Sequence, residues 1–199
     1  MTEMCASPAV APDDAALAHL LAPIRARAMA CTACSLHASR TQVVFGTGSA
    51  RSGLLIIGEA PGATEDATGL PFVGRSGKLL SQFLGGIGLA REDVFIANVL
   101  KCRPPANRAP KPEEARACAP LLSAQIEALR PRIILALGLS AARWLIPGKA
   151  PMSVLRQGEH SYLGTRTLVT FHPAAILRNP NNRGEAEADF ARLAKLLGR

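Results

Sequence analysis

The chain has few aromatic residues and no long apolar run. Only 4% of its 199 residues are Phe, Trp or Tyr, although 48% are hydrophobic. The core must therefore be built mainly from Ala, Leu, Ile and Val, which suits helices packed on a parallel sheet. No stretch of about 18 apolar residues is present, and this excludes a membrane-spanning helix.

A secretory signal is also missing, because the first residues include Glu3, Asp13 and Asp14 and lack a basic start followed by an apolar segment. We therefore expect a cytoplasmic protein in a reducing compartment, where cysteines favour metal sites over disulfides. Residues 1–12 are small and turn-rich and are expected to form a disordered tail. Residues 13–199 then form a single domain.

Acidic residues are too few to balance the basic ones. The chain has 15 Asp and Glu against 23 Lys and Arg, which gives a formal net charge of +8. Such an excess favours a polyanionic partner, with nucleic acid as the first candidate, although a merely basic solvated surface is the alternative. A complete phosphate-binding loop is missing, because Gly77-Lys78 is followed by Leu79; nucleoside triphosphate chemistry is therefore not expected.

Short apolar runs alternate with helical patterns along the chain, in the order 54–57, 76–88, 94–97, 112–129, 132–137, 168–170 and 184–197. This alternation predicts an α/β fold, a three-layer α/β/α arrangement around a central four-stranded parallel sheet. A hairpin-like excursion is expected over residues 158–165. Ligands of such folds bind at the carboxyl ends of the strands, where residues distant in sequence converge.

The loop after the first apolar run gathers acids, glycines and an aromatic residue. Glu59 directly follows Gly58, and Glu65 and Asp66 come shortly after it. Carboxylates at the end of a buried strand are candidates for activating water or stabilising a cation. Phe72 offers a face on which a base could stack, or it anchors the loop to the core.

Two later apolar runs also end in polar side chains. Asn98 presents both a donor and an acceptor, the pattern needed to read a pyrimidine edge, or it caps the turn. His172 could hydrogen-bond a developing anion, although a histidine in this place is more often structural. We expect both side chains to meet the acidic loop at one edge of the sheet.

The cysteines indicate a metal site. Cys31 and Cys34 form a C-x2-C pair, and Cys102 and Cys118 supply two more thiols. Four thiolates from three segments suit an iron-sulfur cubane or a structural zinc ion, and buried cysteines acting as small apolar residues are the alternative. Cys5 lies in the expected tail and is not expected to be a ligand.

Four motifs, in this order, resemble those of the iron-sulfur uracil-DNA glycosylases, the fourth family of the uracil-DNA glycosylase superfamily. They are GEAPG-x2-ED from Gly58, GLPFVG-x2-G from Gly69, N-x2-KCRPP-x-NR-x-P from Asn98 and HPAAILRNP from His172. The resemblance covers roughly residues 31–199. It implies the uracil-DNA glycosylase-like fold and a 4Fe-4S cluster held by the four cysteines named above.

The resemblance also implies the activity. A monofunctional uracil-DNA glycosylase flips uracil out of DNA and hydrolyses its N-glycosidic bond, leaving an abasic site for a downstream abasic-site endonuclease in base-excision repair. Uracil-containing DNA would be the partner, with no membrane, and the protein is expected to be a monomer. The alternative is a non-catalytic iron-sulfur protein of the same fold that binds nucleic acid.

Within this family Phe72 would stack on uracil, Asn98 would read its edge and His172 would face its O2 atom. Gly58 and Ala60 would line the same pocket. Better-known relatives carry an aspartate at the position of Ala60, so the catalytic acid must lie elsewhere. We expect Glu65 to activate the water, followed in order of preference by Glu59 and Asp66.

The last motif would provide an apolar wedge for the minor groove, flanked by charge. Its members are Ile176, Leu177 and Arg178. Further basic residues are candidates for phosphate contacts, which position DNA without reading its sequence: Arg75, Lys78, Arg103, Arg108, Lys111 and Arg156.

Overall fold

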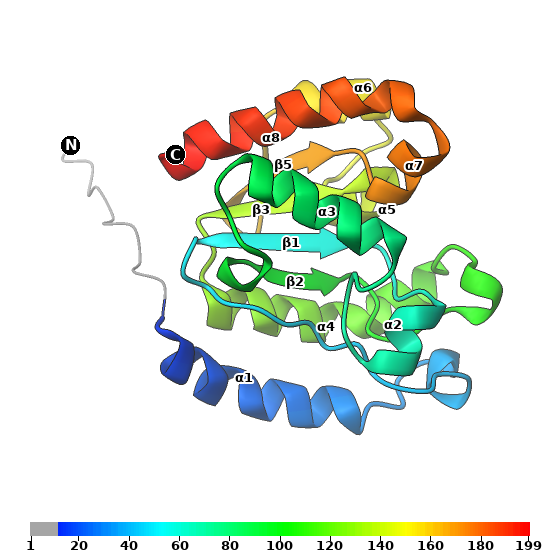
Figure 1. Cartoon of the computed structure of the whole chain (residues 1–199). Coiled ribbons are helices and arrows are strands. Elements are labelled where there is room, and N and C mark those ends of the chain that lie inside the picture. The colour runs from blue at the N-terminus through cyan, green and yellow to red at the C-terminus, as the bar shows by residue number, and fades with distance from the viewer. Residues whose placement is uncertain (1–11) are drawn as a thin grey trace, which may run out of the picture.

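The structure is a computed structural model and describes residues 12–199, so nearly all of the predicted tail, with Cys5, lies outside the described residues. Strands and helices alternate through the rest of the chain (Figure 1). The strands are β1 (Leu54–Gly58), β2 (Phe95–Asn98), β3 (Ile133–Leu137), β4 (His160–Tyr162) and β5 (Thr165–Thr170). The α-helices are α1 (Asp14–Met29), α2 (Ala63–Thr68), α3 (Arg75–Gly86), α4 (Pro112–Leu129), α5 (Gly138–Leu145), α6 (Met152–Gln157), α7 (Pro173–Arg178) and α8 (Arg183–Leu197).

The strands form one sheet in the order β2-β1-β3-β5-β4. The first four are parallel, as predicted, but β4 pairs antiparallel with β5 and makes the sheet five-stranded. The predicted excursion is thus a hairpin that extends the sheet. Its turn residues, Leu163 and Gly164, both have positive φ, as tight hairpin turns require. The α/β fold and its four parallel strands are confirmed, and the sheet has one strand more than predicted, because β4 has only three residues and is not apolar.

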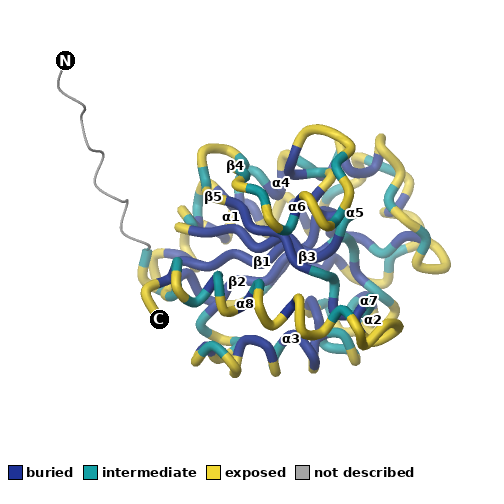
Figure 2. Tube along the Cα trace, turned by 90° about the horizontal axis from the view of Figure 1, so that it is seen from above, coloured by how far each residue is buried: buried dark blue, intermediate teal, exposed yellow. Residues whose placement is uncertain are grey.

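Helices cover both faces of the sheet in three layers (Figure 1). The apolar side chains of α1 and α4 pack with one face, and those of α3 and α8 pack with the other. Strands β1, β2 and β3 are buried along their length and β5 over its last four residues, whereas the outer helix faces are exposed (Figure 2). Within residues 12–199 there is no helix with the length and apolar character needed to cross a membrane.

Local sequence signals explain the helix starts. Asp13 caps α1 by accepting a hydrogen bond from Ala16 N at 2.8 Å. Pro112 opens α4, and Glu114 accepts a hydrogen bond from Lys111 N at 2.8 Å. Three short helices, α2, α6 and α7, were not predicted, since each has only six residues.

The parallel register brings the ends of neighbouring strands together. Gly58 lies opposite Asn98, the last residues of β1 and β2. Gly138 directly follows β3, and His172 follows β5 by two residues. The predicted convergence of Glu59, Asn98 and His172 at one edge is therefore observed.

Candidate active site

An open cleft of about 900 Å³ lies at the carboxyl edge of the sheet. Loops and short helices that follow all four parallel strands line it, so side chains far apart in sequence share one wall. Its volume suits a ligand of small-molecule size together with part of a larger polymer. The predicted catalytic and uracil-binding residues in its lining are Glu59, Ala60, Glu65, Phe72, Asn98 and His172, whereas Gly58 lies behind this lining.

Phe72 lies tightly against the end of β1. A Cβ atom on Gly58 would lie 2.4 Å from Asn98 Oδ1 and 2.6 Å from Phe72 Cζ. Phe72 itself has a φ of 51°, and a Cβ atom on Gly77 would lie 1.6 Å from its carbonyl oxygen. Gly58 and Gly77 therefore allow a strained backbone that holds the Phe72 ring beside the Asn98 amide.

Asn98 carries an unused hydrogen-bonding atom. The residue is 1% exposed, and its Oδ1 atom has no partner among the described residues. A buried amide oxygen without a partner costs free energy, so it is best explained by a donor that a ligand brings. Because Asn98 lines the cleft, this donor would be an N–H group of a bound ligand.

His172 is neutral and its proton position follows from its contacts. Ala174 N donates to Nδ1 at 3.1 Å, so the proton of the neutral ring lies on Nε2. Burial lowers the pKa of His172 to about 4, with Arg178 adding to the effect and Glu65 opposing it. The ring centroid lies 5.5 Å from that of Phe72. The cleft therefore holds a neutral N–H donor beside an aromatic ring.

The three predicted acids occupy different environments. Glu65 accepts hydrogen bonds through Oε1 from Val73 N and Gly74 N, at 3.0 and 3.1 Å, and through Oε2 from Gly62 N at 3.2 Å. Its carboxylate thus holds the loop that carries Phe72. Glu59 is half-buried in the cleft lining, and its carboxylate has no hydrogen bond from residues 12–199.

Asp66 lies outside the cleft. It is 3% exposed, and its Oδ1 atom accepts hydrogen bonds from Thr41 N at 3.0 Å and Gln42 N at 3.4 Å. Its carboxylate fixes α2 to the segment that follows Cys31 and Cys34. The structure thus assigns Asp66 a structural contact instead of the predicted place among the catalytic acids.

Comparison with known proteins agrees with this geometry. A family model described as the uracil DNA glycosylase superfamily matches residues 45–197. The chain belongs to the uracil-DNA glycosylase superfamily. It is similar to a Type-4 uracil-DNA glycosylase of Thermotoga maritima, with 46% identity over 165 residues, covering 82% of this chain and 86% of that protein. A Type-4 uracil-DNA glycosylase of Archaeoglobus fulgidus is 42% identical over 184 residues, covering 86% and 90%.

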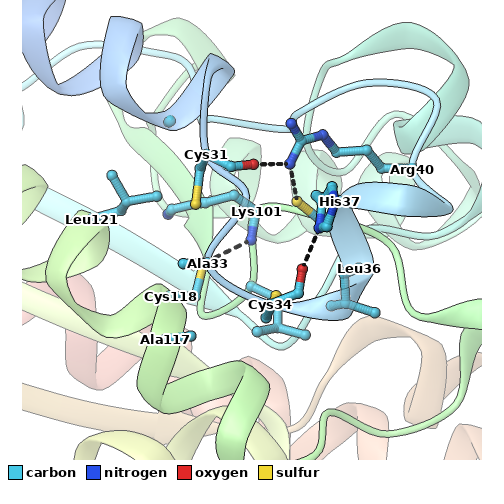
Figure 3. Close-up of a pocket in the computed structure, with 13 residues that line it drawn as sticks. Cys31, Ala33, Cys34, Leu36, His37, Arg40, Lys101, Ala117, Cys118 and Leu121 are labelled. Carbon is cyan, nitrogen blue, oxygen red and sulfur yellow. Dashed lines mark hydrogen bonds between the residues drawn. The ribbon is translucent and has the colours of Figure 1, made fainter.

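In this uracil-DNA glycosylase domain the four predicted metal ligands line one pocket (Figure 3). Cys31 and Cys34 follow α1, Cys102 follows β2, and Cys118 lies on α4; none forms a disulfide. Within residues 12–199, no group of three His, Cys, Asp or Glu side chains is arranged to hold a single metal ion. The thiols surround a shared space instead of converging on one point.

Two basic residues, Arg40 and Lys101, also line this pocket and were not predicted from the sequence to do so. Arg40 donates to Cys31 O at 2.8 Å (Figure 3). It also donates to Cys102 Sγ at 3.4 Å. Lys101 is 1% exposed, and burial lowers the pKa of its ammonium to about 8. The signal was present, because a lysine between the apolar pair Val99-Leu100 and Cys102 has few ways to reach water.

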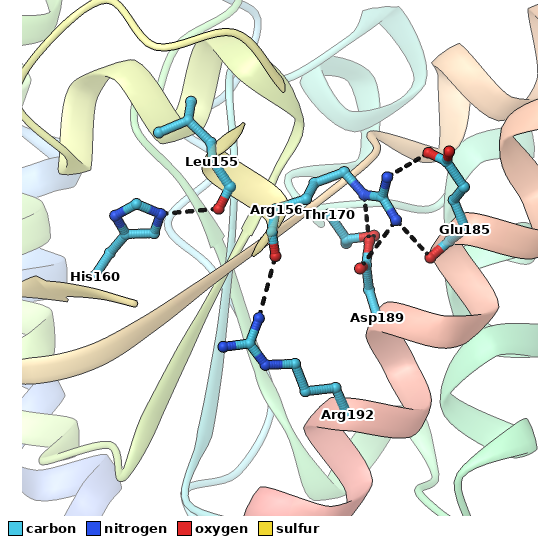
Figure 4. A network of polar contacts seen from close by, with 7 residues as sticks. All are labelled: Leu155, Arg156, His160, Thr170, Glu185, Asp189 and Arg192. Atoms are coloured by element: carbon cyan, nitrogen blue, oxygen red, sulfur yellow. Dashed lines mark hydrogen bonds and ion pairs between the residues drawn. The ribbon is translucent and has the colours of Figure 1, made fainter. Parts of the chain in front are cut away.

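Arg156, predicted to contact phosphate, has another role in this glycosylase domain. Its guanidinium pairs with Glu185 and with Asp189, where Nε lies 2.7 Å from Oδ2, and its side chain is 9% exposed (Figure 4). It also lies 4.6 Å from the centre of the Phe171 ring. The prediction fails for Arg156 because its donors are used inside the fold, joining α6 to α8.

The predicted wedge is divided between core and surface. Ile176 is 4% exposed and packs with α3 and α8, so it cannot enter a groove without unfolding α7. Leu177 is 48% exposed at the cleft, and Arg178 beside it is exposed as well. Among the other candidates for phosphate contacts, Arg75, Lys78 and Lys111 are exposed. Arg103 donates a hydrogen bond to Asn107, and Arg108 forms an ion pair with Glu114.

Proposed function

We propose that this protein is a monofunctional uracil-DNA glycosylase of base-excision repair. The observation that carries the proposal is the buried, unpartnered Oδ1 atom of Asn98 in a cleft shared with Phe72 and neutral His172. The Type-4 relatives, named as uracil-DNA glycosylases, support it. No observation favours a binding protein without activity, because such a protein would not need the neutral donor.

Recognition of uracil follows from the Asn98 amide. Its Oδ1 atom would accept the N3–H of uracil, and its NH2 group would donate to O4. Cytosine presents the opposite pattern, an acceptor at N3 and a donor at C4, so it would leave the buried amide unpaired. Phe72 would stack on the flipped base, which loses its neighbours in the duplex.

Bond cleavage leaves a uracil anion and a cationic sugar. The Nε2–H of His172 would donate to uracil O2 as negative charge develops there, and a neutral donor is already in the required state at neutral pH. We propose Glu59, with its carboxylate free in the cleft, as the group that stabilises the sugar cation and orients the attacking water. Glu65, expected from the sequence to do this, becomes the residue that positions the Phe72 loop.

Cys31, Cys34, Cys102 and Cys118 would hold a 4Fe-4S cluster. A cubane spreads its four thiolates farther apart than a single tetrahedral zinc ion does, and this suits four thiols that line one pocket. The cluster would cross-link three segments: the segment that follows α1, the loop that follows Asn98 at the end of β2, and helix α4. We assign it no step in the reaction.

DNA would lie across the mouth of the cleft. Leu177 would fill the space that the flipped base leaves, and Arg178, Arg75, Lys78 and Lys111 would contact phosphates. We propose that the protein acts as a monomer in the cytoplasm. A separate abasic-site endonuclease would process its product.

The test uses a duplex oligonucleotide with one uracil. We expect the wild-type protein to release uracil and leave a strand that breaks only after alkali, whereas a matched cytosine duplex stays intact. Glu59→Gln should lower the single-turnover rate about 100-fold or more, since it removes the charge and keeps the shape. Retention of uracil by the cluster-loaded wild-type protein, despite binding of the DNA, would overturn the proposal.

A further inference from the structure

Lys101 lies between the cysteine pocket and the strand end that carries Asn98. Its ammonium donates to Asn98 O at 2.8 Å, and its main-chain N–H donates to Cys118 Sγ at 3.3 Å. It lines the same pocket as the four cysteines (Figure 3). One fully buried residue therefore contacts both a metal-ligand candidate and the main chain of the uracil-reading residue.

The charge of Lys101 lacks a partner within the polypeptide that the structure describes. Five ion pairs form among residues 12–199, and Lys101 takes part in none of them. A buried ammonium is costly unless it is paired, and one main-chain carbonyl does not neutralise it. A cluster bound by four thiolates carries net negative charge and would supply the missing counter-charge.

We propose that Lys101 is a positioning residue that couples the cysteine site to uracil recognition, serving as the internal counter-ion of the cluster while fixing the main chain of Asn98. The inference rests on the proposed function of the cleft and of the cysteines. It assigns Lys101 a role distinct from ligation and from contact with the base. The coupling runs through one residue, whose main-chain N–H contacts Cys118 Sγ and whose ammonium contacts the carbonyl of Asn98.

Arg40 provides a matched comparison. Its guanidinium donates to Cys102 Sγ, so it also places positive charge at the pocket. Its other hydrogen bonds go to Cys31 O and Met29 O, on the side of α1. Arg40 therefore shares the electrostatic role of Lys101 but makes no hydrogen bond to Asn98.

The first measurement is the reduction potential of the cluster in the loaded protein, by voltammetry, together with its iron content. A nearby cation favours the more negative, reduced cluster, so Lys101→Met and Arg40→Met should both lower the potential. Lys101→Gln should lower it as well, because the amide carries no charge. An unchanged potential in Lys101→Met would contradict the counter-ion role.

The second measurement is excision of uracil under single-turnover conditions, with KM measured separately. Lys101→Met should lower the rate about 10-fold or more while KM, set by contacts to DNA, changes less than about 2-fold. Arg40→Met should keep the rate within about 2-fold. Lys101→Gln keeps a donor for Asn98 O and should recover part of the rate.

The results separate this inference from the proposed function. Equal rates in Lys101→Met and the wild type would overturn the positioning role, as would equal losses in Lys101→Met and Arg40→Met. Failure of both Lys101 variants to fold with iron would show that the ammonium serves the whole fold, which also contradicts the inference. If the wild-type protein leaves uracil in place, the proposed function is wrong. The reduction potentials of the Lys101 and Arg40 variants would still test the counter-ion role.

Discussion

His172 is held neutral by its surroundings, and this can be observed directly. We expect its ring to titrate with a pKa of about 4 and to carry its proton on Nε2 at neutral pH, because burial opposes the charge and Ala174 N occupies Nδ1. Nitrogen-15 NMR of the imidazole reports both properties. A midpoint near 6.5, or a proton on Nδ1, would contradict the proposed donor.

The same pKa affects stability. Between about pH 6.5 and pH 4 the unfolded chain binds a proton at His172 and the native state does not. The free energy of unfolding should therefore fall as pH is lowered through this window, and the contribution of His172 to that fall should disappear in His172→Gln. Urea denaturation at several pH values measures the difference, and parallel pH profiles for the two proteins would exclude it.

Gly58 makes room for the two residues proposed to hold uracil. Gly58→Ala should lower the single-turnover rate about 100-fold, because the added Cβ would collide with Asn98 Oδ1 and with the Phe72 ring. Gly85→Ala on α3 is the control, since a Cβ there meets nothing within 4 Å. If the two variants were equally active, Gly58 would not be shaping the pocket.

At the scale of elements, the short helix α2 links the cysteine segment to the cleft. Asp66→Ala should lower the free energy of unfolding by about 1–3 kcal/mol, because the main-chain N–H groups of Thr41 and Gln42 lose their acceptor. Its excision rate at saturating DNA should change little. Chemical denaturation compares it with Glu127→Ala, an exposed position on α4; a large loss of kcat would restore Asp66 as a catalytic acid.

Sequence patterns predict the elements that are long or apolar. The bounds of α4 followed from a proline at the helix start, and those of β1, β2 and β3 followed to within one residue from continuous apolar runs, whereas β5 begins three residues before its apolar run. The strand β4 was missed because its pairing depends on β5 and not on its own residues. The helices α2 and α7 are likewise too short to show a period.

The site was predictable where a residue's place depends on the strand it follows. Asn98 and His172 reach the cleft for that reason. The roles of Glu65, Asp66 and Arg156 depended on partners distant in sequence, such as Asp189 for Arg156, which no local pattern reveals. Burial of Ile176 likewise depends on the helices that pack against it.

At the scale of the whole molecule, the net charge of +8 should make DNA binding depend on salt concentration. Replacing Arg75 or Arg178 by Gln should lower the dependence of log K on log salt by about 1, if each contacts one phosphate. Arg116→Gln is the control, an exposed arginine on α4 that does not line the cleft. Fluorescence anisotropy at several salt concentrations measures these slopes. Equal slopes of log K against log salt in all three variants would show that Arg75 and Arg178 make no specific phosphate contacts.

The central claim is that one buried amide reads uracil for excision. Its most direct test is the single-turnover rate on uracil and cytosine duplexes, for the wild type and for Asn98→Ala. We predict that the wild type excises uracil and leaves cytosine, and that Asn98→Ala loses at least about 100-fold on uracil while its cluster content and DNA affinity are kept. Uracil excision by Asn98→Ala at the wild-type rate would contradict the account.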